Sequence, residues 1–187
     1  RTCATCSGGQ QALDSILSRI ERWQRLLARD RSGLLSEQEV RGLFGELTFL
    51  HDELLPRYGS RAVEFWNGPE GCPQDFSIFS TVVEIKTRTG SGPGRVRISS
   101  PEQLWPSLPS MFLCVYFLAV DAPGGMSLND LVSRIRTQLD DPGHLSTFER
   151  RLESVGYLDL PEYDSSTLLA DRLDTFHVGP GFPCITP

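Results

Sequence analysis

The stretch TVVEIKTRTG, residues 81–90, carries the clearest structural signal in this chain. Its β-branched residues indicate a strand, and the side chains of a strand alternate between its two faces. Val83 and Ile85 should therefore cover one face, while Glu84 and Lys86 share the other, about 7 Å apart along the chain. Lys86 is the only lysine among 18 basic residues, so a chain that otherwise uses arginine has kept a lysine here.

The segments around this stretch are also predicted to be extended. Residues 62–66, 74–79 and 95–99 are short, rich in β-branched and aromatic residues, and separated by turn formers such as NGPEG and GSGPG. With residues 82–88 they are predicted to form an antiparallel meander. The apolar run MFLCVYFLAV, 111–120, is typical of a central strand buried on both faces and is too short to span a bilayer.

The remaining segments are predicted to be mostly helical. Apolar residues recur at helical spacing over 10–29, and Ser36 with Glu39 forms a capping box for a second helix that should end at Pro56. Further predictions are one helical turn at 101–105, helices over roughly 128–139 and 145–154, and a strand at 173–178. The expected fold is α/β, with helices packed on a mixed sheet. An N-terminal helical extension (residues 1–35) should precede the main domain (residues 36–187).

The composition excludes several classes of protein. A hydrophobic content of 39 % and a charged content of 22 % are ordinary for a globular domain. The net charge of −6 argues against a surface that coats nucleic acid everywhere, although it is compatible with a local basic groove. Five scattered cysteines form no disulfide framework, and Cys3 and Cys6 lack a second pair at zinc-ribbon spacing. No signal peptide is visible, so we expect a cytoplasmic protein without a membrane segment.

A candidate metal site follows from the carboxylates near the lysine. Asp75 lies nine residues before Glu84, and a hairpin between the two segments would bring both carboxylates together. A hard divalent cation such as Mg²⁺ would relieve their repulsion, polarise a phosphoryl oxygen and lower the pKa of a bound water. Lys86 can orient or deprotonate that water, whereas an arginine is planar and does not give up its proton. Glu46, at the margin of the second helix's apolar stripe, is predicted to be a third acid that faces the sheet edge.

Four motifs at these positions resemble the PD-(D/E)XK nuclease superfamily. They are GELTFL (45–50), QDF (74–76), VEIKT (83–87) and ISSPEQL (98–104), together with a W-x-G-P turn formed by Trp66, Gly68 and Pro69. More narrowly, the sequence resembles a bacterial family of formerly unknown function that is often encoded in restriction-like or anti-phage gene clusters. The resemblance covers roughly residues 35–187. It implies a restriction-endonuclease-like core, in which a mixed central sheet is flanked by helices.

The resemblance also implies roles for individual residues. Glu46 would support the metal, Asp75 and Glu84 would bind it together with the backbone carbonyl of Ile85, and Lys86 would activate or position water. Gln103 would face the same site and position the water or a phosphate. The metal would be Mg²⁺, with Mn²⁺ as an alternative, and its number is left open. Two departures stand out in this sequence: Gln74 replaces the literal proline before the aspartate, and Pro106 with Pro109 shortens the helix that follows the third strand.

Three functional hypotheses remain open at this point. The first is a Mg²⁺-dependent endonuclease acting on DNA in a defence or restriction-like system, with RNA left open as substrate. Arg88, Arg95 and Arg97 are its candidate phosphate contacts, and its partners would be an ATPase, helicase or methyltransferase subunit or a second copy of the chain. The second is a catalytically silent module on the same fold that binds nucleic acid or a partner. The third is a protein-interaction domain whose strand charges form a surface ladder.

Overall fold

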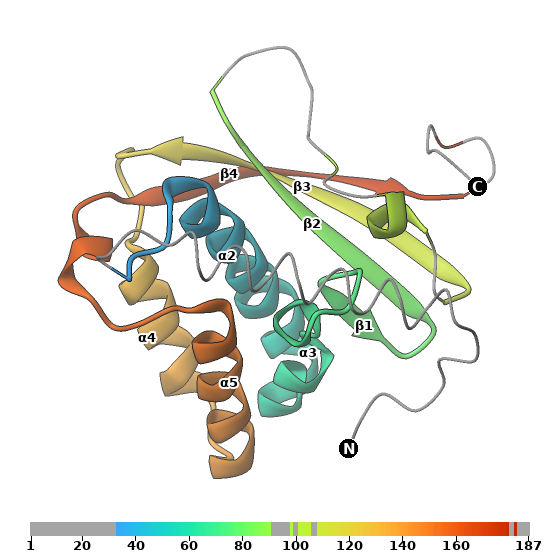
Figure 1. Cartoon of the computed structure of the whole chain (residues 1–187), viewed down its shortest axis with the longest axis horizontal. Coiled ribbons are helices and arrows are strands. Elements are labelled where there is room, and N and C mark those ends of the chain that lie inside the picture. The colour runs from blue at the N-terminus through green and yellow to red at the C-terminus, as the bar shows by residue number, and fades with distance from the viewer. Residues whose placement is uncertain (1–32, 91–97, 99–100, 106–107, 180–181, 183–187) are drawn as a thin grey trace. The chain divides into compact units, whose positions relative to one another are not determined.

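The computed structural model describes residues 33–90, 98, 101–105, 108–179 and 182 (Figure 1). The chain divides into two units, residues 1–34 and 35–187, and the described residues belong almost entirely to the second. The predicted helix over 10–29, the Cys3–Cys6 pair, and both Arg95 and Arg97 lie outside the described residues. The division into an extension and a main domain stays a prediction.

A four-stranded mixed sheet forms the centre of the described unit (Figure 1). Its strands are β1 (Phe76–Ile78), β2 (Thr81–Thr89), β3 (Ser110–Val120) and β4 (Leu168–His177), and they lie in the order β1-β2-β3-β4. β1 pairs with β2 and β3 with β4 in antiparallel fashion, whereas β2 and β3 are parallel. The predicted α/β fold with a mixed sheet and an interior strand at 111–120 is confirmed.

The predicted meander is confirmed at the β1–β2 hairpin and wrong at residues 62–66, whereas its segment 95–99 lies, except for Ile98, outside the described residues. Residues 62–66 belong mostly to a 3₁₀ helix, Gly59–Phe65, in place of the expected strand. The carbonyl of Val63 accepts a hydrogen bond from the Arg151 guanidinium, and Trp66 forms a single bridge with Phe76. Tertiary contacts with a distant helix therefore override the local β-propensity of this segment. β3 then runs parallel to β2, which requires the long connection between Thr89 and Ser110.

The helix that carries Glu46 begins as predicted and ends later than predicted. α2 (Glu37–Phe49) has the expected capping box between Ser36 and Glu39. The chain then continues through a π-helical turn, Leu50–Leu54, into α3 (Leu55–Tyr58), and Pro56 lies in the first turn of α3. The prediction that Pro56 ends the helix is wrong, because proline is tolerated in a first turn, where its missing N–H has no partner to lose.

α2 packs on β2 at unusually short range through Gly45. A Cβ atom on Gly45 would lie closer than 3.0 Å to Cγ2 of Thr87 and 3.4 Å from Cγ2 of Ile85. Only a residue without a side chain allows this approach. Thr87 and Ile85 thus occupy the helix-facing side of the sheet, and Glu84 and Lys86, one residue out of phase, belong to the other side.

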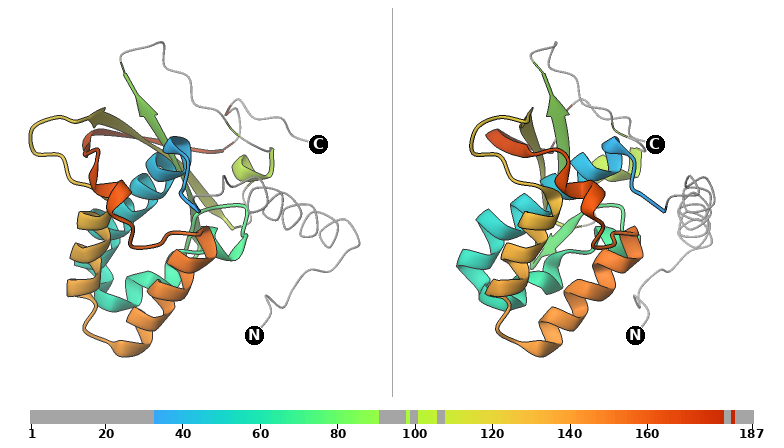
Figure 2. Two further views of the ribbon diagram at one scale, coloured as in Figure 1. Left: turned by 60° about the vertical axis from the view of Figure 1, so that its left-hand side comes forward. Right: turned by 90° about the vertical axis from the view of Figure 1, so that its left-hand side faces the viewer.

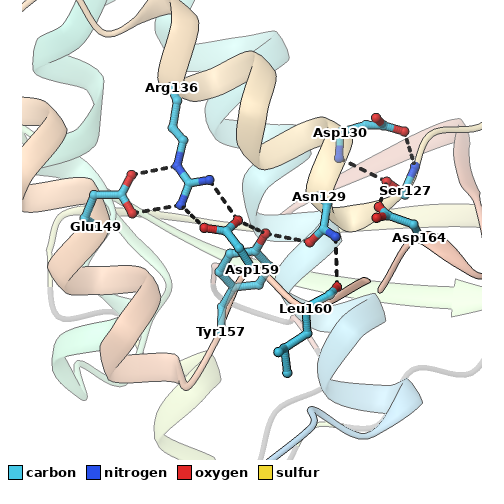
Figure 3. Close-up of polar contacts among 9 residues, drawn as sticks. All are labelled: Ser127, Asn129, Asp130, Arg136, Glu149, Tyr157, Asp159, Leu160 and Asp164. Atoms are coloured by element: carbon cyan, nitrogen blue, oxygen red, sulfur yellow. Dashed lines mark hydrogen bonds and ion pairs between the residues drawn. The ribbon is translucent and has the colours of Figure 1, made fainter. Parts of the chain in front are cut away.

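The remaining helices pack on the same side as α2 (Figure 2). They are α4 (Leu128–Gln138), capped by Ser127 as predicted, and α5 (Pro142–Val155). Figure 3 shows how they are joined: Arg136 of α4 donates to both carboxylate oxygens of Glu149 in α5 and to Asp159 in the loop that follows. None of the described helices is long and apolar enough to cross a membrane.

The sheet's second face is only partly covered within the described residues. Near the start of β2 it carries a small apolar cluster, formed by Val82, Leu104, Met111, Leu113, Val115 and Val178. Leu104 lies in the predicted helical turn, which is a 3₁₀ turn at Pro101–Leu104. In β3 the cluster continues alongside the charged residues of β2, because Leu113 pairs with Glu84 and Val115 with Lys86.

Candidate active site

Glu84 and Lys86 lie in the middle of β2, on one face as their spacing predicts. Glu84 is fully buried, and its Oε1 accepts a 2.5 Å hydrogen bond from Nζ of Lys86. The other oxygen, Oε2, is buried without a hydrogen-bond partner in the described part of the chain. A buried carboxylate oxygen without a partner is costly unless a ligand or a cation satisfies it. Oε2 of Glu84 is therefore the atom of this pair that is available to a ligand or a cation.

Asp75 immediately precedes β1, and the hairpin brings it to β2 as predicted. The register pairs Phe76 with Val83, so Asp75 comes opposite Glu84. Its Oδ2 accepts a 2.7 Å hydrogen bond from the amide of Ile85. Because the amide and carbonyl of one strand residue point to the same edge, the carbonyl of Ile85 also leaves β2 on the edge that Asp75 occupies.

Glu46 reaches this edge from α2 and is held there by a buried tryptophan. The indole Nε1 of Trp66 donates a 2.7 Å hydrogen bond to Oε2 of Glu46. Trp66 is fully buried and packs against Phe148 of α5, with ring centroids 5.9 Å apart. The hydrogen bond from Trp66 therefore explains why Glu46 lies at the sheet edge as predicted. From the sequence, Trp66 is noted only as part of the W-x-G-P turn, without a role at the site.

The W-x-G-P turn brings Glu46 and Asp75 together. The amides of Asn67 and Gly68 both donate to the carbonyl of Asp75, at 2.8 and 2.9 Å. A Cβ on Gly68 would lie 3.1 Å from Oδ1 of Asp75 and 3.4 Å from Oε2 of Glu46. The two carboxylates thus flank one small space that any side chain at position 68 would crowd.

The pKa values of the three carboxyls reflect this crowding. Burial, and next the carboxylate of Asp75, raises the pKa of Glu46 from 4.5 to about 8. Burial raises the pKa of Asp75 to about 6, against the opposing effects of the Lys86 ammonium and the Ile85 amide. Burial and then Asp75 raise the pKa of Glu84 well above its usual range. One ammonium group does not offset three clustered acids, so the site is short of positive charge.

A divalent cation fits this shortage. Each carboxylate is held through one oxygen: Oδ2 of Asp75 by the Ile85 amide, Oε1 of Glu84 by Lys86, and Oε2 of Glu46 by Trp66. The second oxygen of each has no hydrogen-bond donor among the described residues. Oxygen ligands of this kind suit Mg²⁺ and Mn²⁺.

A ready-made cluster of metal-binding side chains is not part of this arrangement. Across residues 33–90 and 108–179, no group of three His, Cys, Asp or Glu side chains stands close enough to hold a metal ion. The predicted ligand set does not require one, because it consists of Asp75, Glu84 and the main-chain carbonyl of Ile85. Each of these two carboxylates has one oxygen without a hydrogen-bond donor among the described residues.

Gln74 connects the site to the segment that carries Gln103. Gln74 is 3 % exposed, and its Nε2 donates to the carbonyls of Glu102 and Trp105, at 2.8 and 3.0 Å. Neighbouring residues of an extended chain point to opposite sides, so Asp75 turns to the carboxylates while Gln74 turns to residues 101–105. The residue that departs from the literal PD motif thus has a structural role. The role predicted for Gln103 itself is not tested.

Among the predicted phosphate contacts, only Arg88 lies in the described residues. It follows Lys86 on the same face of β2, and its guanidinium lies over the ring of Phe117, 4.9 Å from the centroid. Arg88 is therefore on the side of the sheet where Glu84 and Lys86 lie.

Comparison with known families agrees with this geometry. Residues 3–187 match the family model described as "Putative PD-(D/E)XK family member, (DUF4420)". The chain belongs to this family. The PD-(D/E)XK resemblance drawn from residues 35–187 is thus confirmed, and the match extends further toward the N-terminus. Comparisons with curated proteins and with solved structures gave no match.

The PD-(D/E)XK assignment accounts for the arrangement of three of the four motifs. The helix glutamate, the aspartate and the E-x-K pair come from α2, the start of β1, and β2, and the fold brings all of them to one edge of the sheet. A nuclease-like fold is therefore established.

Proposed function

We propose that the chain is a Mg²⁺-dependent nuclease that hydrolyses phosphodiester bonds of DNA. The observation that carries this proposal is the buried Oε2 of Glu84, which has no hydrogen-bond donor in the described part of the chain and lies beside the chain's only lysine. A bound divalent cation would polarise the scissile phosphate and acidify a water molecule. Mn²⁺ would serve in its place, because it takes the same oxygen ligands.

The chain's own residues would divide the remaining work. Asp75 and Glu84 would hold the cation with the carbonyl of Ile85, and Glu46 would keep the cation's position by its negative charge. Nζ of Lys86 would orient the attacking water and offset the charge that develops on the phosphate oxygens. Gln103 would contact the water or a neighbouring phosphate, because Gln74 ties its segment to the Asp75 loop.

We further propose a place for this activity in a defence or restriction-like system in the cytoplasm. The sequence contains no helix-turn-helix or zinc-finger motif, so sequence reading would fall to partner subunits such as an ATPase, a helicase or a methyltransferase. A second copy of the chain is another candidate partner.

One observation favours a second candidate, a silent module that binds nucleic acid or a partner. In the described residues no three acidic side chains are spaced for metal binding, and one oxygen of Glu84 is already occupied by Lys86. A module without a metal would need Lys86 only as the counter-ion of a buried acid. Under this alternative, an arginine at position 86 would serve nearly as well.

The lysine therefore separates the two candidates. The purified chain would be incubated with plasmid DNA, linear duplex, single-stranded DNA and RNA, in Mg²⁺, Mn²⁺ or EDTA. We expect cleavage that needs metal and falls by at least about 10²-fold in both Lys86→Ala and Lys86→Arg. Arg134→Gln, a charge change on the exposed side of α4, is the control and should cleave normally. Nucleic-acid binding with no cleavage in any metal would refute the nuclease proposal, and cleavage that survives Lys86→Arg would refute the role given to Lys86.

A further inference from the structure

An arginine pair is stacked on one aromatic ring next to the candidate active site. Arg88 of β2, Phe117 of β3 and Arg172 of β4 are neighbours across three strands in the sheet register. The guanidinium carbon of Arg88 lies 4.9 Å from the Phe117 ring centroid, and that of Arg172 lies 3.6 Å from it. Residues that are far apart in the sequence thus place two positive groups within 5 Å of one point.

This arginine–phenylalanine cluster lies on the same face of the sheet as the catalytic candidates. Lys86 and Arg88 are two residues apart in β2 and therefore point the same way, while Thr87 between them faces Gly45 of α2. Lys86 and Arg88 are about 7 Å apart along the strand, which corresponds to about two nucleotides of rise along one strand of a duplex. The cluster is thus at the right distance to bind a phosphate near the one that reacts.

The side chain of Arg172 is accessible and has donors to offer. It is 58 % exposed. Asp174 is its hydrogen-bond acceptor among the described residues, with a single contact at 2.9 Å from Nη2. A guanidinium has five N–H donors in a plane that matches a phosphate, and stacking on a ring fixes that plane without using the donors.

The electrostatics of the cluster favour an anion. Two guanidinium groups that share one ring repel each other, and the carboxylate of Asp174 contacts the guanidinium of Arg172. As a purely structural contact, a cation–π pair at an exposed site would contribute only about 0.5–1 kcal/mol. That contribution gives little reason to place a second arginine on the same ring. A backbone phosphate bound by Arg172 beside this ring would lower that repulsion.

We propose that Arg88, Phe117 and Arg172 form a binding site for a backbone phosphate of the nucleic-acid strand that is cleaved at Glu84 and Lys86. Arg172, which had no role in the sequence analysis, is the new contact, and Phe117 is the residue that positions both arginines. This inference rests on the proposed nuclease function, whose substrate it places along this face of the sheet, from β2 to β4.

The test is a binding experiment that does not depend on cleavage. Fluorescence anisotropy would follow fluorescein-labelled 20-nucleotide DNA, single-stranded and duplex, in EDTA at several salt concentrations. For Arg172→Gln and for Arg88→Gln we expect weaker binding and a salt dependence (log K against log salt) that is shallower by about 0.7–0.9, the loss of one phosphate contact. Arg172→Lys should keep the salt slope and lose affinity, because the charge remains and the planar fork does not. Phe117→Leu should weaken binding although both charges remain.

The matched control is Arg134→Gln, which removes one exposed positive charge from α4, among the helices on the opposite side of the sheet. The inference would be overturned if the salt dependence of DNA binding were the same in Arg172→Gln as in the native chain. It would also be overturned if Arg134→Gln reduced that salt dependence as much as Arg172→Gln does, or if the native chain bound neither oligonucleotide. Uptake of Mn²⁺ by the same preparations tests the metal centre separately. Binding through Arg172 without metal uptake would therefore support this site while refuting the nuclease, and metal uptake without DNA binding would do the reverse.

Discussion

The close approach of α2 to β2 at Gly45 makes a sharp prediction about how Glu46 is positioned. In Gly45→Ala the new methyl group would lie closer than 3.0 Å to Cγ2 of Thr87. Thr87 is β-branched and fixed in a strand, so it cannot swing aside as a long flexible side chain would. The helix must therefore move away from the strand, and Glu46, the next residue, moves with it.

The magnitude follows from two opposing effects. Overpacking of a methyl group costs about 1–3 kcal/mol, and the overlap here is deep enough to expect the upper half of that range. Replacing glycine by alanine inside a helix returns about 1 kcal/mol. We therefore expect Gly45→Ala to lower the free energy of unfolding by about 1–2 kcal/mol. The shift of Glu46 should also weaken Mn²⁺ binding.

Urea unfolding followed by tryptophan fluorescence measures the stability change, and the same helix offers a matched control. A Cβ on Gly42, one turn earlier in α2, would have nothing within 4 Å, so Gly42→Ala should stabilise the chain by about 0.5–1 kcal/mol. In the double variant Gly45→Ala/Thr87→Ala, the clashing Cγ2 methyl group of Thr87 is gone. We therefore expect the double variant to be more stable, by at least about 1 kcal/mol, than the sum of the two single effects on the free energy of unfolding. The reasoning is refuted if Gly45→Ala is as stable as Gly42→Ala, or if the double variant is additive within about 0.5 kcal/mol.

Three further predictions concern the residues around the carboxylates. In EDTA the free energy of unfolding should fall as the pH rises from about 4.5 to 8, by up to about 1.4 kcal/mol per pH unit for each proton. The reason is that folded Glu46, whose pKa is raised to about 8, keeps a proton that the unfolded chain releases near pH 4.5. Chemical denaturation at several pH values should show that the free energy of unfolding depends less steeply on pH in Glu46→Gln than in the native chain. An unchanged pH dependence would contradict the raised pKa of Glu46. Trp66→Phe keeps the packing against Phe148 but loses the hydrogen bond to Glu46, so Mn²⁺ affinity at pH 7 should fall about tenfold and partly recover at higher pH; calorimetry that shows native affinity would refute this role. Gln74→Leu removes two hydrogen bonds to the 101–105 segment and should cost about 1–3 kcal/mol, with faster proteolysis of that segment, and an unchanged digestion pattern would argue against the cross-link.

The sequence was most informative where one local rule decides the outcome. Strand alternation places Glu84 and Lys86 on one face, a capping box marks the start of α2, and the hairpin brings Asp75 to β2. Each of these depends on residues close together in the chain. The expected position of Glu46 at the sheet edge follows from helical periodicity in the same way.

The remaining features depend on contacts between distant residues, which no local pattern contains. Residues 59–65 are helical because α5 packs on them, in spite of their β-branched and aromatic composition. The contact from Trp66 to Glu46 spans 20 residues, and the stacking of Arg172 on Phe117 joins two strands through a register that only the folded sheet defines. A glycine such as Gly45 gives a hint of close approach, but the sequence does not say which strand it meets.

The most direct measurement is a titration of the purified chain with Mn²⁺ by isothermal calorimetry, repeated on Asp75→Asn and Glu84→Gln. Asp171→Asn, the same chemical change at an exposed carboxylate of β4, is the control. The proposed centre predicts that the native chain and the control bind Mn²⁺ with release of protons, and that both site variants bind at least about 100-fold more weakly. A native chain that takes up no Mn²⁺ even with oligonucleotide present, or an Asp75→Asn variant that binds as the native chain does, would contradict the account.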